Sequence, residues 1–390
     1  MTDMFDYLLW RGDLAIEKDS FNEVDGIIMA ALSYIPFELI KEHMEGKISL
    51  GKAAELILEI PDIEEKLLFK KDYRLLCEVI KSERFKNILL SGYENFINTE
   101  TQTQFSAITA TLEKKLHCVC FRGTDDNLIG WKEDFNMAFV SPVPGQKSAV
   151  KYLEKSAGRL SGKLIVCGHS KGGNFAIYAS AFCKKTVKRR IEHIYNYDGP
   201  GFTPEILESE GYKSICKKIR TFVPQSSVVG MLLEHEDDFT IVSSHNIGLL
   251  QHGYYSWEVE GRGFVCLEEV TNNSKVIDRT LKKWLYEMSN EQRENFIEAI
   301  YGIVEKTNAT TIKELTDNWF SSAIVILRSV KNLDEPTRKA VNQALGEFVR
   351  CARESLVSVG TAEMKNFSEK IKGFFSGNNE EKKFARLTKS

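Results

Sequence analysis

The stretch that decides the fold is Lys163-Leu-Ile-Val-Cys-Gly-His-Ser-Lys-Gly-Gly-Asn-Phe-Ala-Ile177. It begins with a short apolar run, Leu164 to Cys167, which predicts a buried strand. A glycine-rich turn follows, and the apolar segment from Asn174 to Cys183 then predicts a helix. The stretch therefore predicts a strand, a sharp turn and a helix in immediate succession.

The turn contains a serine in the pattern G-x-S-x-G, from Gly168 to Gly172. In a nucleophile elbow the serine projects from a sharp strand-to-helix turn, and the flanking glycines let strand and helix approach each other. The five-residue pattern alone arises by chance, so the flanking strand and helix carry the interpretation. They indicate that Ser170 is a nucleophile, whereas the alternative is a tight turn in which Ser170 only caps the helix. His169 is expected to point into the core.

Segments around the elbow alternate between strand-like and helix-like patterns. The predicted strands are 104–112, 115–121, 163–167, 191–197, 218–223 and 239–243, with helices at 146–160 and 171–183. Such alternation with short connections favours a mostly parallel sheet covered on both faces. A last strand pair, 254–260 and 263–269, is expected to close the sheet edge. An elbow on such a sheet predicts the α/β-hydrolase fold.

The flanking regions are predicted to be helical. Helices are expected at 26–34, where Asp25 would be the cap, at 52–60 and at 64–85. The chain becomes helical again from about Asn273, and its tail is polar. We therefore predict a helical N-terminal segment (1–100), an α/β-hydrolase core (101–270) and a helical C-terminal segment (271–390). Whether the helical segments form a lid is left open.

Composition restricts the class of protein. Of the 390 residues, 43% are hydrophobic and 27% charged, and the formal net charge is -3, as in ordinary globular proteins. This balance does not favour nucleic-acid binding. The N-terminus does not resemble a signal peptide, and no apolar run reaches the roughly 18 residues of a membrane-spanning helix. The eight cysteines form no CxxC pair and are interpreted as reduced thiols. These features predict a soluble, cytoplasmic protein.

Two further motifs precede the elbow. Phe121-Arg-Gly-Thr124 ends a predicted strand, and Trp131-Lys-Glu-Asp134 follows a polar loop. Together with Gly168-His-Ser-Lys-Gly-Gly173, they resemble the class-three triacylglycerol lipases, which carry an FRGT-type oxyanion segment, a W-x-x-D run and GHSxGG. The resemblance implies that Thr124 helps to form an oxyanion hole, with the N–H of Lys171 as its partner.

The wider pattern is similar to a bacterial family of lipase-like α/β-hydrolases, a cytosolic family of unknown function. Its members begin with segments like Arg11-Gly-Asp13 and Phe21-Asn-Glu-Val-Asp25 and end in a helical part. This resemblance covers most of the chain, but only residues of about 104 to 260 carry hydrolase motifs.

The base is expected among the histidines that follow the elbow. The α/β-hydrolase order is serine, then acid, then histidine, and His235, His245 and His252 all follow Ser170. His252 is preferred because it precedes a late strand, where such enzymes place their base, and because it resembles the terminal histidine of the lipases. His245 and His235 remain alternatives.

The acid is harder to assign. Class-three lipases carry it in a D-x-V-P context, but the matching stretch here, Val223 to Gly230, has Ser226 and Ser227 instead of an aspartate. One strand earlier, Asp198 is followed by Gly-Pro-Gly-Phe202, which is similar to the acid position of pancreatic-type lipases. We therefore predict Asp198 as the acid. The weaker candidates are Glu234, Asp237 and Asp238.

These residues predict carboxylic ester hydrolysis through an acyl-enzyme. The resemblance alone favours lipid or lysolipid esters, and it implies no metal or organic cofactor. Two alternatives remain: an acyltransferase or thioesterase with the same triad, and a degenerate hydrolase fold that serves as a binding module. The oligomeric state is left open.

Overall fold

The computed structural model of the chain describes residues 2–125, 130, 133, 136–137, 142–227, 229–231, 233, 239–246, 248–271 and 275. The chain divides into two compact units, Met1–Val270 and Thr271–Ser390. The helices predicted beyond residue 275 lie outside the described residues. The three-part organisation into helical, hydrolase and helical segments stays a prediction.

Among the described residues, a nine-stranded sheet forms the centre of the first unit, in the order β1-β2-β3-β4-β5-β6-β7-β8-β11. Strands β4 to β8 run parallel, while β1 to β4 and the pair β8–β11 are antiparallel. The bounds are β1 Ile48–Ser49, β2 Leu89–Asn98, β3 Thr103–Glu113, β4 Leu116–Phe121, β5 Lys163–His169, β6 Ile191–Tyr197, β7 Ile219–Pro224, β8 Phe239–Val242 and β11 Cys266–Leu267. The α/β-hydrolase fold is confirmed, with a mixed sheet whose parallel half carries the elbow.

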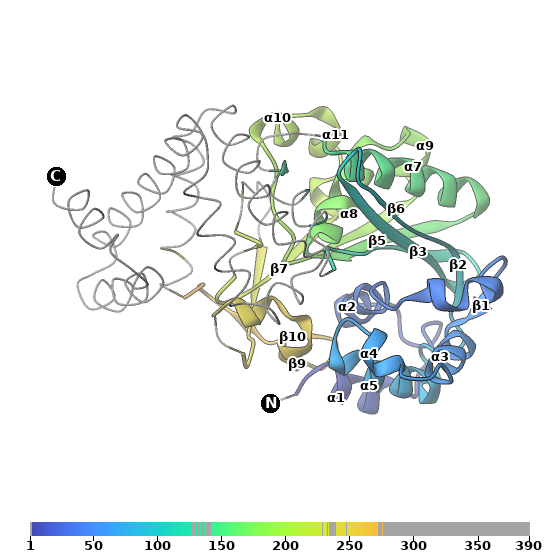
Figure 1. Cartoon of the computed structure of the whole chain (residues 1–390). Coiled ribbons are helices and arrows are strands. Elements are labelled where there is room, and N and C mark those ends of the chain that lie inside the picture. The colour runs from blue at the N-terminus through green and yellow to red at the C-terminus, as the bar shows by residue number, and fades with distance from the viewer. Residues whose placement is uncertain are drawn as a thin grey trace, which may run out of the picture. The chain divides into compact units, whose positions relative to one another are not determined.

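Helices cover the sheet on both faces (Figure 1). On one face pack α7 (Pro144–Arg159) and α8 (Lys171–Phe182). The other face is covered by helices of the first eighty residues. These are α1 Met4–Arg11, α2 Glu23–Leu32, η1 Phe37–His43, α3 Leu50–Leu58, α4 Ile63–Lys66 and α5 Lys70–Lys81. Short helices fill later connections: α9 Lys185–Lys188, α10 Pro204–Leu207, α11 Glu210–Lys213, η2 Cys216–Lys218, η3 Gly248–His252 and η4 Tyr254–Ser256.

The two faces are explained by the alternation of side chains along each strand. In β4, Cys118 and Cys120 belong to the core under the N-terminal helices, whereas Val119 and Phe121 belong to the core under α7 and α8. Helix α2 is buried along nearly its whole length and packs on β4, β5 and β6. The N-terminal helices are therefore part of the layered hydrolase unit.

Strand β2 was not expected, because the first hundred residues were interpreted as mainly helical. Its pairing with β3 shifts register between Ser91 and Glu94, and Gly92 has a φ of +65° there. A bulge of this kind interrupts the two-residue alternation by which a strand is recognised in a sequence. The antiparallel part of the sheet therefore extends beyond the predicted β3–β4 pair to β2 and β1.

Helix boundaries also differ from the expectations. The cap of α2 is Asn22, and Asp25 closes the capping box by accepting the Asn22 N–H. The helix expected at 64–85 is two helices, α4 and α5, because Leu67 is extended.

The late strand pair differs as well. Residues 254–256 form η4, and β9 (Val259–Glu260) and β10 (Gly263–Phe264) form a separate two-stranded sheet. The edge of the main sheet is closed by β11, which pairs with β8. The predicted strand pair, 254–260 and 263–269, is therefore only partly confirmed. Its two segments do pair through β9 and β10, but β11 closes the edge of the main sheet.

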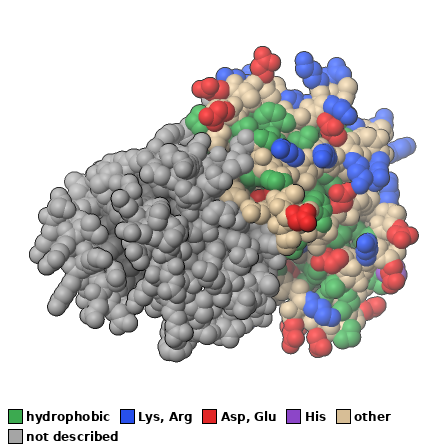
Figure 2. All heavy atoms as spheres, turned by 45° about the horizontal axis from the view of Figure 1, so that its top comes forward, with side chains coloured by type: hydrophobic (Ala, Val, Ile, Leu, Met, Phe, Trp, Pro, Cys, Tyr) green, Lys and Arg blue, Asp and Glu red, His purple; other side chains and the backbone are tan. Residues whose placement is uncertain are grey.

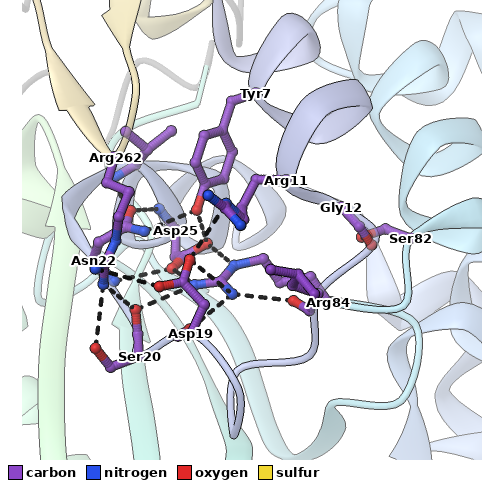
Figure 3. A network of polar contacts seen from close by, with 12 residues as sticks. Tyr7, Arg11, Gly12, Asp19, Ser20, Asn22, Asp25, Ser82, Arg84 and Arg262 are labelled. Atoms are coloured by element: carbon purple, nitrogen blue, oxygen red, sulfur yellow. Dashed lines mark hydrogen bonds and ion pairs between the residues drawn. The ribbon is translucent and has the colours of Figure 1, made fainter.

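A buried ion pair lies where two N-terminal segments come together, Arg11–Asp13 and Phe21–Asp25, which carry the family resemblance (Figure 3). The Arg84 guanidinium binds the Asp25 carboxylate through Nε and Nη2 and donates from Nη1 to the carbonyl oxygens of Leu14 and Asp19. Neither Arg84 nor Asp25 is solvent-exposed, and Tyr7 Oη donates to Asp25. This network joins α1, α2 and the segment after α5.

Charged side chains of both signs are mixed over the described surface that Figure 2 shows. No extended area of a single sign is visible on the described part of this face. None of the helices in the described part of the chain is both long and apolar enough to span a membrane.

Candidate active site

Ser170 lies at the sharp turn between β5 and α8, with φ of +57° and ψ of −134°. A positive φ is unfavourable for a residue with a side chain, so the surrounding structure must hold it. A Cβ on Gly168 would lie 2.2 Å from the carbonyl oxygen of Gly172, and one on Gly172 would lie 2.2 Å from that of Phe121. Only glycines permit this approach of strand and helix, so the predicted elbow has its expected geometry.

The Phe121–Thr124 segment lies against the elbow. A Cβ on Gly123 would lie 2.6 Å from the carbonyl oxygen of His169 and 3.0 Å from the Cβ of Ser170. Thr124, the next residue, is half-buried, and Lys171, the first residue of α8, directly follows Ser170 in the chain. Of the two residues expected at an oxyanion hole, Lys171 therefore adjoins the serine, and Thr124 follows the glycine that packs against it. Trp131 and Asp134 lie outside the described residues.

Asp198 follows β6, the parallel neighbour of β5. It has a φ of +52° and is fully buried. The N–H of Ser170 donates to the carbonyl oxygen of Tyr197 at 2.9 Å, which ties the elbow to the residue before Asp198. Both side chains therefore stand at the carboxyl ends of adjacent parallel strands.

The Asp198 carboxylate receives three donors. His252 Nδ1 lies 2.6 Å from Oδ2, Ser227 Oγ donates to Oδ1 at 2.5 Å, and the Gly230 N–H donates to the same oxygen at 3.1 Å. Since a carboxylate only accepts hydrogen bonds, this arrangement satisfies a buried group that would otherwise be costly. Ser227, at the position where the lipases carry an acid, thus contacts the acid of the neighbouring strand.

His252 is the last residue of η3, and its side chain is 27% exposed. The helix is held by Gln251, whose Oε1 accepts from the Ser226 N–H and whose carbonyl accepts from Trp257 Nε1. His245 is exposed, and its N–H donates to the Ser256 carbonyl. Of the two predicted bases that the structure describes, His245 and His252, it is His252 that bonds to Asp198. The alternatives His235, Glu234, Asp237 and Asp238 lie outside the described residues.

His169 is buried beside His252, as expected of an elbow residue that points into the core. Burial, and secondly the nearby His252, hold the pKa of His169 well below its usual value. A neutral imidazole carries one N–H and one acceptor nitrogen. The buried His169 ring is therefore neutral in the physiological pH range.

A buried ion pair behind the elbow was missed in the sequence. Lys171 Nζ lies 3.3 Å from Glu133 Oε2 and 2.9 Å from Gln104 Oε1, and Lys171 and Glu133 are each about 1% exposed. Glu133 also accepts the N–H groups of Gln104 and Gly145. The sequence did carry a signal for this pair, a lysine at the start of an otherwise apolar helix. A lysine buried there needs a partner of opposite charge. The pair joins α8 to β3 and to the start of α7.

In the described part of the chain, one group of three thiols has sulfur atoms close enough together to bind a single metal ion. The sulfurs of Cys118, Cys120 and Cys167 lie 3.4 to 3.5 Å apart, and all three residues are buried in the core beneath α2. Burial raises the pKa of the Cys118 thiol. These contacts are those of small side chains packed in the core.

Comparison with known proteins identifies a family. A sequence profile of the Mbeg1-like family matches residues 79–302. No curated protein sequence matches the chain. The bacterial origin and the class-three relationship of the predicted resemblance stay predictions.

Two solved structures are similar to the chain at low identity. The first is a fungal lipase–inhibitor complex, whose structure gave a model for interfacial activation in lipases. It is 14% identical to this chain, with a TM-score of 0.32, and the match covers 51% of this chain and 82% of that chain. The other is M37 lipase, with 14% identity and a TM-score of 0.31 over 52% of this chain and 68% of that one.

Proposed function

We propose that this chain, which belongs to the Mbeg1-like family, is a serine hydrolase that cleaves carboxylic esters. The observation that carries the proposal is the 2.6 Å contact between His252 Nδ1 and Asp198 Oδ2. Asp198 and the strained elbow of Ser170 both follow the carboxyl ends of neighbouring parallel strands. A nucleophile, a base and an orienting carboxylate are the groups that acyl transfer requires.

In the proposed reaction, Ser170 Oγ attacks the ester carbonyl carbon while His252 Nε2 takes its proton. Asp198 holds the His252 ring and stabilises the imidazolium that forms. The Lys171 N–H at the start of α8 and Thr124 stabilise the tetrahedral oxyanion. His252 then protonates the departing alcohol, which leaves an acyl-enzyme on Ser170. Water, activated by His252, hydrolyses the acyl-enzyme and restores the free serine.

The buried surroundings support this assignment of roles. Asp198 is fully buried and bonded by three donors, so its position is fixed before substrate binds. His252 is partly exposed, which leaves its outer edge accessible to a reacting group. Preorganised groups of this kind lower the barrier because they need no rearrangement during the reaction.

The substrate class is proposed from the lipase-like sequence motifs: lipid or lysolipid esters. A cytoplasmic, soluble protein without nucleic-acid partners or a cofactor is proposed from composition and motifs alone.

The experiment is ester turnover with p-nitrophenyl esters of increasing acyl length. The wild-type protein should hydrolyse them, and Ser170→Ala and His252→Ala should each reduce kcat towards the background rate, by about 10⁴-fold or more. His245→Ala is the matched control, because this exposed histidine does not contact Asp198, and it should keep wild-type activity. Absence of turnover with every ester and thioester tested would favour a degenerate hydrolase fold.

A further inference from the structure

His169 joins the nucleophile elbow to the segment that carries the proposed base. It is the last residue of β5, directly before Ser170, and it is 3% exposed. Its Nε2 lies 2.8 Å from the carbonyl oxygen of His252. Its Nδ1 lies 3.0 Å from Tyr34 Oη. The side chain therefore contacts two segments that are distant in the sequence.

The partners define the protonation of the His169 ring. A carbonyl oxygen can only accept a hydrogen bond, so Nε2 carries the proton and donates it to His252. The unprotonated Nδ1 then accepts from the Tyr34 hydroxyl. Burial keeps the ring neutral by lowering its pKa. One neutral tautomer thus satisfies both contacts.

The His169 ring also packs against the His252 ring. The two centroids are 4.5 Å apart with an angle of 36° between the planes. Tyr254 packs edge-on against His169 on another side, with a centroid distance of 4.8 Å. His252 is thereby fixed at three points: Nδ1 by Asp198, its carbonyl oxygen by His169 Nε2, and its ring face by the His169 ring.

We propose that His169 is a positioning residue, which holds the imidazole of His252 in place relative to Ser170, and that Tyr34 fixes the orientation of His169. The inference deepens the proposed function and rests on it. His169 is adjacent to Ser170 in the chain, so it places base and nucleophile in one rigid unit. It does not touch the reacting atoms, and it acts through His252.

The chain offers a matched control in His117. This histidine is also buried, its Nδ1 contacts Thr111 Oγ1 at 3.1 Å, and its Nε2 contacts the Ser161 carbonyl at 3.0 Å. It lies near the amino end of β4, whereas His169 lies at the carboxyl end of the parallel strand β5. His117→Leu therefore removes the same kind of contacts at the opposite ends of the parallel strands.

The first test compares kcat and KM for ester turnover in His169→Leu, His169→Gln and His117→Leu. A misplacement of about 1 Å can cost about 10²-fold in rate, so His169→Leu should lower kcat about 10- to 100-fold with KM little changed. The amide N–H of glutamine can replace Nε2–H, so His169→Gln should recover most of kcat. His117→Leu should lower the melting temperature and leave kcat unchanged. Equal kcat values for wild type and His169→Leu would overturn the proposal.

A second test needs no substrate. The proton between His252 Nδ1 and Asp198 should give a far-downfield ¹H NMR resonance, which is lost in His252→Ala. In His169→Leu this resonance should shift or broaden, and in His169→Gln it should return towards the wild-type position. An unchanged resonance in a folded His169→Leu protein contradicts the positioning role. If wild type shows no turnover while the resonance still responds to His169, the proposed function fails and the positioning inference stands. Tyr34→Phe, which keeps the aromatic ring, gives the same readout if His169→Leu does not fold.

Discussion

At the scale of single residues, the acid is the point on which sequence reasoning had least support. The sequence left open whether the acid is Asp198 or a residue near Ser227, with Glu234, Asp237 and Asp238 as weaker candidates, and pattern alone could not relate Asp198 to Ser227. In the structure they contact each other, because β6 and β7 are adjacent and parallel. A cross-strand contact of this kind depends on the register of the strands, which single-sequence patterns do not specify.

The first prediction separates the two residues. Asp198→Asn should reduce kcat about 10⁴-fold, because an amide cannot stabilise the imidazolium and favours the wrong tautomer. Ser227→Ala should cost far less, since the Gly230 N–H still donates to the same oxygen. Steady-state turnover of one ester by both variants checks this. A greater loss in Ser227→Ala than in Asp198→Asn would contradict the assignment.

A second residue-scale prediction concerns pH. Burial raises the pKa of Asp72 from its ordinary value of 3.8 to about 6 in the folded protein, although Tyr255 Oη and the Phe69 N–H donate to it. The folded state therefore binds this proton more tightly than the unfolded state does. The resulting stability is complete below about pH 4 and is lost as the pH rises through about 6.

Asp72→Asn isolates this effect because asparagine does not titrate. The unfolding free energy of wild type minus that of the variant should fall by at most about 3 kcal/mol between about pH 4 and pH 6. Above that range the difference should be flat. Urea unfolding of both proteins at several pH values measures it, and a difference that rises with pH would show that the sign is wrong.

At the scale of elements, the elbow depends on the close approach of β4, β5 and α8. Gly172 is the contact point with the Phe121 carbonyl. Gly172→Ala should therefore destabilise the protein by about 3 kcal/mol, as overpacking at a backbone contact does, and should reduce ester turnover in the protein that remains folded.

Gly158 provides the control for this variant. It lies near the end of α7, where a Cβ would project into open space beyond the helix's own backbone. Gly158→Ala should therefore raise stability by about 0.5 to 1 kcal/mol, since alanine is the better helix former. Thermal unfolding of both variants checks the pair, and equal effects would contradict the account of the elbow.

Much of this architecture could be predicted from the sequence. The elbow, strands β3 to β7, α7, α8 and the contact of His252 with Asp198 follow from local apolar runs and from the order of motifs. The features that could not be predicted have physical reasons. The bulge near Gly92 hides β2, the side chain of Asn22 competes with Asp25 as a cap, and the Lys171–Glu133 pair needs the tertiary fold.

At the scale of the whole first unit, the N-terminal helices form one face of the hydrolase layers, and the turn after α2 supplies Tyr34, which contacts His169. Arg84→Met should destabilise this unit by about 3 to 5 kcal/mol, because it leaves the Asp25 carboxylate buried without its partner. Lys81→Met, which removes a solvent-exposed ion pair with Glu78, should change stability by less than about 1 kcal/mol. Urea unfolding distinguishes them, and similar losses would contradict the role given to the buried pair.

The most direct test of the central claim, that Ser170 is an activated nucleophile, is covalent modification by a fluorophosphonate followed by mass spectrometry of the peptides. The wild-type protein should carry one phosphonate per chain, on the peptide that contains Ser170. Ser170→Ala should not be modified, and His252→Ala should be modified much more slowly. An unmodified wild-type protein, or a Ser170→Ala protein that is modified as fast as wild type, would contradict it.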